Sequence, residues 1–189
     1  QFTALIDDSD DSILNNITTV ALSSLYTPST SGSFSFVIQF GNPLYNPHSG
    51  HNSSSGGIIA STGFYIQGNT NEMFFDDDGA GNLRIYYLTS GARTYYSNEA
   101  GTVNYTTGLV SVNPIYITSV SDVDDNASTA IRITATPNSN DIISKRNQIV
   151  EIDLINTTII GGRDTVVVGS GGGTSNYITT SNYVSPSSY

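Results

Sequence analysis

The sequence predicts a mainly β fold, made of antiparallel hairpins and meanders in a sandwich-like arrangement with at most short helical turns. The apolar residues are chiefly Ile, Val, Leu and Tyr, and abundant Ser, Thr, Asn and Gly separate them, as in short strands joined by polar turns. Several segments alternate apolar and polar residues, which is the period of a half-buried strand. Gly, Asn and Asp lie between these segments, where tight turns need them. The alternative is an α+β fold.

The first 27 residues combine a helical and an extended pattern. Ile13, Ile17 and Val20 fall near helical spacing after an acidic turn at residues 7–11. Residues 17–27 are rich in β-branched side chains and end at a proline. We therefore expect a short helical turn followed by a strand.

Residues 33–40 predict a half-buried strand. Phe34, Phe36, Ile38 and Phe40 alternate with other residues and would form an aromatic inner face. The next segment, 41–57, contains two prolines, both histidines and a Ser-Ser-Gly-Gly run, so we expect a long surface loop. Extended structure resumes over residues 58–66.

Two hairpins follow. Met73–Phe75 and Leu83–Leu88 flank a Gly- and Asp-rich turn, and a third strand at 94–97 would extend this hairpin into a meander. Residues 101–105 and 109–112 predict a second, compact hairpin, in which Gly108 supplies the positive φ of the turn.

Further strands are predicted on both sides of an acidic loop and in the segment after Pro137. Residues 115–120 and 130–136 would pair antiparallel across the loop 122–126. A turn capped by Asp141 would lead into a strand at 149–154, and 165–168 would form one more strand.

The domain organisation follows from these elements. We expect one β-rich assembly domain over residues 1–168, with a possible subdivision near 98–100. Residues 169–189 are rich in Gly, Ser and isolated Tyr, which is the composition of a tail.

Composition excludes several classes of partner. Six Lys and Arg stand against sixteen Asp and Glu, for a formal charge of −10, so the chain repels nucleic-acid phosphates. It contains no Cys, which rules out disulfides and thiol chemistry. No apolar run reaches the roughly 18 to 20 residues of a membrane span. We expect neither nucleic acid nor membrane as a partner.

Four stretches, taken in order, resemble the C-terminal region of baseplate wedge proteins of T-even-type contractile-tailed phages, particularly cyanophages. They are Leu5 to Val20, Phe75 to Tyr87, Gly101 to Val112 and Ile131 to Asp153. The run PNSNDI followed by RNQI, within the last stretch, is the most specific part. Gly-Thr-Val-x-Tyr-x-x-Gly hairpins, as in the third stretch, recur in many phage structural proteins.

The resemblance implies a structural virion protein of the tail baseplate, assembled in the host cytoplasm. It implies self-association as a homodimer through the C-terminal region, contacts with other wedge proteins, and no catalytic residues. The start at Gln1 reads either as an internal cut in a longer polypeptide or as a processed terminus, and we favour the internal cut.

Metal chemistry has two candidate segments. Asp76, Asp78 and Asn82 are oxygen ligands of the kind calcium prefers, but the twelfth position of that loop is Tyr87 instead of a bidentate Glu. We interpret the segment as a solvated acidic hairpin turn. His48 and His51 could share one metal ion, but zinc needs at least a third ligand, and we interpret them as surface histidines.

Catalytic chemistry has little support. No Gly-x-Ser-x-Gly elbow marks an activated serine, and the paired aspartates cluster in turn-like segments. The triple glycine at 171–173 lacks the Lys-Ser/Thr ending of a phosphate loop. We expect no catalytic, cofactor or metal site and no enzymatic activity.

The tyrosines bear on the choice of function. The pairs Tyr86-Tyr87 and Tyr95-Tyr96 would each place one ring inward and one outward, and exposed rings suit an interface. The ordered resemblance, the hairpin-rich pattern and the absence of a coherent catalytic set together favour a phage assembly protein. The alternative is a carbohydrate- or receptor-binding β-sandwich module of a phage tail or cell surface, and a third class is a hydrolase on a β scaffold.

Overall fold

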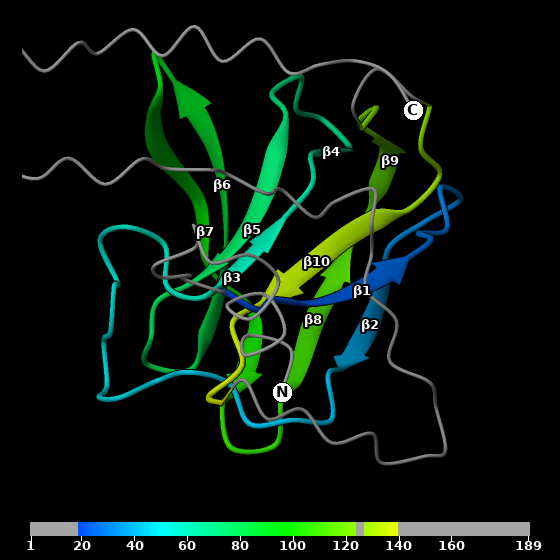
Figure 1. Cartoon of the computed structure of the whole chain (residues 1–189). Helices are drawn as coiled ribbons and strands as arrows, with labels where there is room; N and C mark the ends of the chain where they lie inside the picture. Colours follow the sequence, from blue (N-terminus) through cyan, green and yellow to red (C-terminus); the bar gives the residue numbers. More distant parts are fainter. Residues whose placement is uncertain (1–18, 124–126, 140–189) are drawn as a thin grey trace, which may run out of the picture. The chain divides into compact units, whose positions relative to one another are not determined.

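The computed structural model describes residues 19–123 and 127–139, which form ten strands in two antiparallel sheets (Figure 1). The strands are β1 (Leu22–Tyr26), β2 (Phe34–Gln39), β3 (Ile59–Ser61), β4 (Phe64–Ile66), β5 (Met73–Asp77), β6 (Asn82–Thr89), β7 (Ala92–Asn104), β8 (Leu109–Ile115), β9 (Ile117–Val120) and β10 (Ile131–Ala135). The predicted mainly β fold is confirmed.

The larger sheet has seven strands in the order β2-β8-β7-β6-β5-β4-β9. β8 and β9 follow each other in the chain with only Tyr116 between them, yet β9 pairs with β4 at the far end of the order. The sheet therefore curls, so that its last strand returns to the end of β8. The smaller sheet has the order β1-β10-β3.

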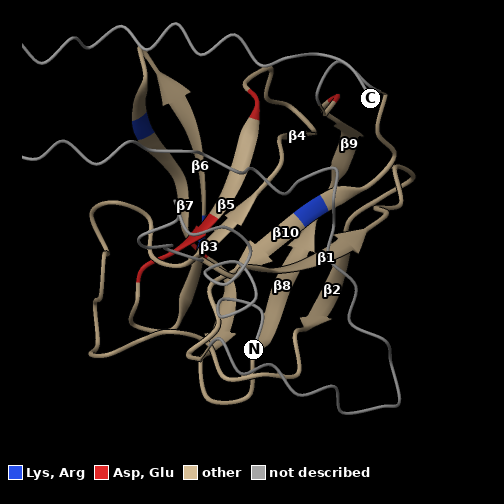
Figure 2. Cartoon of the chain, viewed as in Figure 1, with Lys and Arg blue, Asp and Glu red and all other residues tan. Residues whose placement is uncertain are grey.

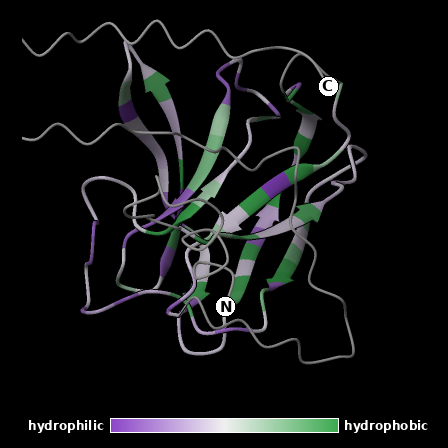
Figure 3. Cartoon of the chain, viewed as in Figure 1, coloured by the Kyte–Doolittle hydropathy of each residue, from purple (hydrophilic) through white to green (hydrophobic). Residues whose placement is uncertain are grey.

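One hydrophobic core joins the two sheets. The Tyr26 ring of β1 stacks on Phe36 of β2 at a centroid distance of 3.6 Å, and Phe75 of β5 stacks on Phe64 of β4 at 4.6 Å. Phe64, Phe75, Ile131 and Ile133 are all at most 1% exposed. Figure 3 shows hydrophobic residues recurring along β2, β8 and β10, the strands that face this core.

The two hairpins predicted from turn chemistry are confirmed. β5 pairs with β6, and β7 pairs with β8 around Gly108, whose φ is +68°. β7 is a single strand of 13 residues that runs through 98–100, where the sequence predicted two shorter strands. The loop 41–57 is also irregular as predicted, with one isolated bridge from Leu44 to Pro137.

The predicted pairing of residues 115–120 with 130–136 is wrong. β9 pairs with β4, whereas β10 lies between β1 and β3 in the other sheet. A connection of about ten residues does not force its two ends to pair. The side chains of β10 alternate between buried and half-buried, and its neighbours come from distant parts of the sequence.

The extended segment 58–66 is split between the sheets. The amide of Thr62 donates to the carbonyl of Arg132 in the smaller sheet, and the carbonyl of Gly63 accepts from Ser121 on the side of the larger sheet. In β2, Phe36 and Ile38 are buried as predicted, but Phe34 is 45% exposed. The predicted helical turns, the strands at 149–154 and 165–168 and the tail lie outside the described residues.

Two glycines with left-handed backbone provide a test of this fold. Gly108 (φ +68°) lies so close to Asn42 that an added Cβ would overlap the Asn42 carbonyl oxygen, whereas Gly91 (φ +81°) has no atom within 4 Å of that position. We expect Gly91→Ala to lower the free energy of unfolding by about 1 to 2 kcal/mol, the cost of a left-handed residue with a Cβ. Gly108→Ala has to move the loop as well, so we expect a loss of about 3 kcal/mol or more. Urea unfolding measures both, and equal losses would contradict the close approach of Asn42.

Candidate functional site

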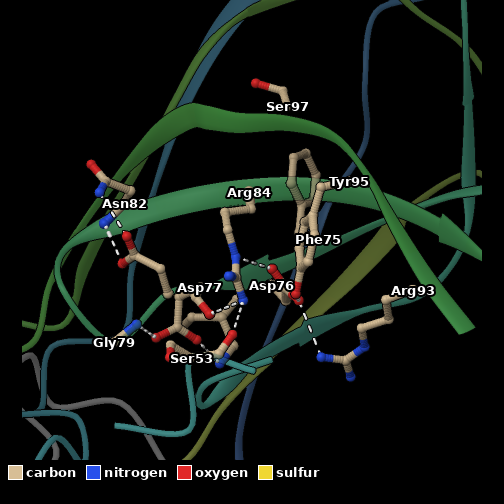
Figure 4. A network of polar contacts seen from close by, with 12 residues as sticks. Ser53, Phe75, Asp76, Asp77, Gly79, Asn82, Arg84, Arg93, Tyr95 and Ser97 are labelled. Carbon is tan, nitrogen blue, oxygen red and sulfur yellow. Dashed lines mark hydrogen bonds and ion pairs between the residues drawn. The ribbon is translucent and has the colours of Figure 1, made fainter. Parts of the chain in front are cut away.

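Three consecutive aspartates lie where β5 meets the turn to β6 (Figure 4). Asp76 is 1% exposed and Asp77 is 0% exposed, so the interpretation of a solvated acidic turn is wrong for both. The physical reason is that β5 continues through Asp77, and the turn begins only at Asp78. Neighbours in a strand point to opposite faces, so Asp76 and Asp77 enter different environments.

Asp76 is the centre of a buried ionic cluster. One carboxylate oxygen, Oδ1, is 2.9 Å from Nε of Arg84, which stands directly opposite in the β5–β6 register. The other oxygen, Oδ2, is 3.1 Å from Nη1 of Arg93 and accepts a hydrogen bond of 3.0 Å from the Tyr95 hydroxyl. The Arg84 guanidinium also lies over the Tyr95 ring, 4.2 Å from its centroid.

The same two arginines bind the loop 41–57. Nη2 of Arg84 donates to the carbonyls of Ser53 (2.9 Å) and Asp77 (2.8 Å), and Nη1 of Arg93 donates to the carbonyl of Ser55. The Asp76 cluster therefore connects the hairpin to a loop more than 20 residues earlier in the chain.

Asp77 holds the residues that directly follow that loop. Its Oδ1 accepts hydrogen bonds of 2.7 Å from the amides of both Ile58 and Ile59, at the start of β3. Its Oδ2 accepts from the Tyr105 hydroxyl at 2.6 Å and from the Gly79 amide at 3.2 Å. This carboxylate thus joins β3, β5 and the β7–β8 turn, and all four of its donors belong to the chain itself.

Burial shapes the protonation of these groups. Burial raises the pKa of Asp76, and the Arg84 and Arg93 guanidinium groups and the Tyr95 hydroxyl act against that rise. Burial, together with the neighbouring Asp77 carboxylate, raises the pKa of Tyr105 far above its usual value. Tyr105 therefore stays a hydrogen-bond donor to Asp77 across the neutral range.

The three residues considered as calcium ligands, Asp76, Asp78 and Asn82, do not converge on one point. Asp78 accepts from the amides of Ala80 and Asn82 and from the Asn82 side-chain amide, at 2.7 to 2.9 Å. Burial acts to raise the pKa of Asp78, but these hydrogen bonds outweigh it and lower that pKa. Asp76 directs its two oxygens to the arginines and Tyr95 instead. The turn is an internally bonded Asx-type structure.

The two histidines lie together on the loop 41–57. Nδ1 of His51 is 3.4 Å from Nε2 of His48, and the Tyr45 ring meets the His51 ring edge-on at 5.2 Å. Both histidines are partly or fully exposed, and His48 borders an open hollow of about 570 Å³ beside Gly79 and the β7–β8 turn. Within the described residues, no three His, Cys, Asp or Glu side chains are grouped as a metal site.

A second hollow, of about 310 Å³, lies where the curled sheet returns on itself. It is bordered by β7, by the β8–β9 junction at Tyr116 and by the 53% exposed ring of Tyr96. Asn113 donates to the backbone carbonyl of Glu99 here at 3.0 Å. No sequence pattern predicts this hollow, because the segments around it are distant in the chain.

Sequence reasoning identified the aspartates but missed their partners. Arg84, Arg93, Tyr95 and Tyr105 complete the cluster, and none of them was singled out as an aspartate partner. A signal for one of them existed, because a hairpin turn centred near residue 80 places Asp76 opposite Arg84. The tyrosine pairs behave as predicted in β6, where Tyr87 packs on the core and Tyr86 stacks on Phe74 of the other face.

No protein-family model, curated protein or solved structure matches this chain. Over residues 19–123 and 127–139, no helix has the length and apolar character that a membrane span requires. A function for this chain is therefore inferred from its sequence and from the geometry of the described residues.

The two neighbouring aspartates Asp76 and Asp78 allow a matched test of the cluster. Asp76→Asn and Asp78→Asn remove the same charge, but only the first leaves Arg84 buried without its ion-pair partner. We expect Asp76→Asn to lower the free energy of unfolding by about 3 to 5 kcal/mol, and Asp78→Asn by about 1 kcal/mol. Urea unfolding measures this loss, and limited proteolysis shows whether the loop 41–57 is released. Similar losses for both variants would mean that the cluster does not hold the loop.

Tyr105 predicts a loss of stability at high pH. Its folded pKa lies above the unfolded value, so its contribution is complete below about pH 10 and is lost as the unfolded tyrosine ionises above that pH. Tyr105→Phe should be less stable than the wild type at neutral pH, because Asp77 loses a donor, and should decline less steeply above about pH 10. Urea unfolding across this range is the measurement. Tyr96→Phe, at an exposed position, is the control and should follow the wild type.

Proposed function

We propose that this chain is a structural virion protein, the C-terminal portion of a phage baseplate wedge subunit that self-associates and contributes to ring assembly. The resemblance of the four ordered stretches motivates the proposal. Two of them fall on central hairpins of the described fold: residues 75–87 span the β5–β6 turn, and residues 101–112 span the β7–β8 turn. We further propose that it functions in the tail baseplate after assembly in the host cytoplasm.

The observation that carries the proposal is that the carboxylates of the acidic hairpin are bonded to groups of this chain. Every carboxylate oxygen of Asp76, Asp77 and Asp78 accepts a hydrogen bond or ion pair from this chain. A general acid or a metal ligand needs an oxygen directed at a substrate or an ion. These carboxylates instead connect the loop 41–57 to the sheet, which supports a role in holding a defined shape for partners.

The carbohydrate- or receptor-binding alternative has less support. It relied on an acidic calcium loop, and Asp76 points away from Asp78 and Asn82 into the ionic cluster. The hydrolase alternative relied on carboxylates facing one cleft, and Asp76 and Asp77 are enclosed among protein donors. Asp124 and Asp125, the other pair considered, lie outside the described residues.

The partners that we propose are a second copy of this chain and other wedge proteins. Nucleic acid fits poorly, because sixteen acidic residues stand against six basic ones. Specific protein interfaces bury about 1,200 to 2,000 Å² in total, so the proposed self-association requires a contact of about this size.

Sedimentation equilibrium of the purified full chain tests the proposal. We expect a reversible monomer–dimer equilibrium that is insensitive to chelators, because the proposed contact is made by protein groups alone. A chain that stays monomeric at high micromolar concentration would contradict self-association. Binding to a glycan array that disappears with a chelator would support the carbohydrate-binding alternative instead.

A further inference from the structure

Strand β2 is an edge of the seven-stranded sheet, and it has one strand neighbour, β8, among the described residues. The amide of Phe40, just after the end of β2, donates to the carbonyl of Gly108, just before the start of β8. Antiparallel ladders alternate direction at every residue, so Phe36 and Ile38 also direct their backbone groups to β8. Ser35, Val37 and Gln39 direct theirs to the open side.

This edge has a register shift against β8 between Phe34 and Phe36, but it lacks the charged residues and prolines by which proteins often protect an open strand. Such edges commonly carry a lysine, a proline or an inward-pointing charge that discourages pairing. The sequence of β2 is FSFVIQ, with none of these, and Val37 is 59% exposed while Phe34 is 45% exposed. The neighbouring strand β1, whose Tyr26 ring stacks on Phe36, adds Leu25 with 68% exposure.

The edge is also free of charge in a strongly acidic protein. No Asp, Glu, Lys or Arg occurs from Ile13 to Asn71, and none occurs from Ala100 to Ser121, whereas the whole chain carries a formal charge of −10. In Figure 2 the strands β1, β2 and β8 accordingly contain neither blue nor red. Two copies with the same negative charge repel each other least where neither copy carries charge.

We propose that β2 pairs antiparallel with the β2 strand of a second copy, around a two-fold axis. An antiparallel edge is self-complementary, because the same strand offers matching donors and acceptors after a two-fold rotation. The contact joins two seven-stranded sheets through the backbone groups of Ser35, Val37 and Gln39, and it covers the exposed Val37 side chain. The inference rests on the proposed self-association and assigns it to one surface.

A matched pair of lysine substitutions tests this assignment. Val37 and Leu88 are exposed to a similar extent, 59% and 52%, but Leu88 lies at the end of the β6–β7 hairpin, away from the sheet edge. Val37→Lys places two like charges opposite each other in the pair, so we expect the dimer dissociation constant to rise at least about tenfold. Leu88→Lys should leave it unchanged. Sedimentation equilibrium measures the constants, and circular dichroism verifies that both variants fold.

Cross-linking provides a second measurement that does not depend on weakening the dimer. The chain contains no cysteine, so Ser35→Cys, Val37→Cys and Gln39→Cys each introduce a single thiol. We expect a short bifunctional maleimide to link the copies of at least one of them into a covalent dimer, and Leu88→Cys to remain uncrosslinked.

The outcomes separate this inference from the proposed function. A wild-type dimer that is weakened by Val37→Lys, together with a cross-link confined to β2, supports the pairing. A wild-type dimer in which the β2 variants behave like the Leu88 variants overturns the pairing and leaves self-association standing. A monomeric wild type overturns both.

Discussion

The buried carboxylates of Asp76 and Asp77 are the constraint on which the described fold depends. Removing an ionised carboxylate from water costs several kcal/mol, and only well-placed donors offset that cost. Asp76 obtains them from Arg84, Arg93 and Tyr95, and these three groups meet it only in the observed register of β5, β6 and β7. A slip of one residue would turn Asp76 to the other face and leave Arg84 buried without its partner. The ionic cluster therefore favours one register of the hairpin over its neighbours.

The same groups also bind the loop 41–57, which has no regular strand pairing. A long irregular segment needs partners for its backbone amides and carbonyls wherever it is shielded from water. The hairpin supplies several of them: the arginines donate to the carbonyls of Ser53 and Ser55, and Asp77 accepts from the amides of Ile58 and Ile59. The Gly79 carbonyl accepts from the Gly50 amide and from the Asn46 side chain. These contacts connect the loop to the sheet at several points along its length.

The sequence predicted the parts of this fold that depend on neighbours in the chain. The β5–β6 and β7–β8 hairpins follow from local turn chemistry, and Gly108 is sufficient to place the second one. Pairing between distant strands has no such signal, so β10 was assigned to β9 when it lies between β1 and β3. The burial of Asp76 was not predicted for a related reason. Acidic clusters are usually solvated turns, and composition alone does not show that one of them is buried. Only the hairpin register, which sets Asp76 opposite Arg84, distinguishes a buried pair from a turn.

One rule connects the ionic cluster with the open edge. Where water is removed, a charged side chain has to be paired or absent, because an unpaired buried charge is costly. At the β5–β6 hairpin Asp76 is paired with arginines of the next strands, and Asp77 accepts hydrogen bonds from backbone amides and from Tyr105. At β2 charged side chains are absent instead, because none occurs from Ile13 to Asn71. An uncharged apolar edge left in water would invite uncontrolled strand pairing. Its presence in an acidic protein is most simply explained if one defined partner covers it, and a two-fold copy satisfies both the hydrogen bonding and the charge.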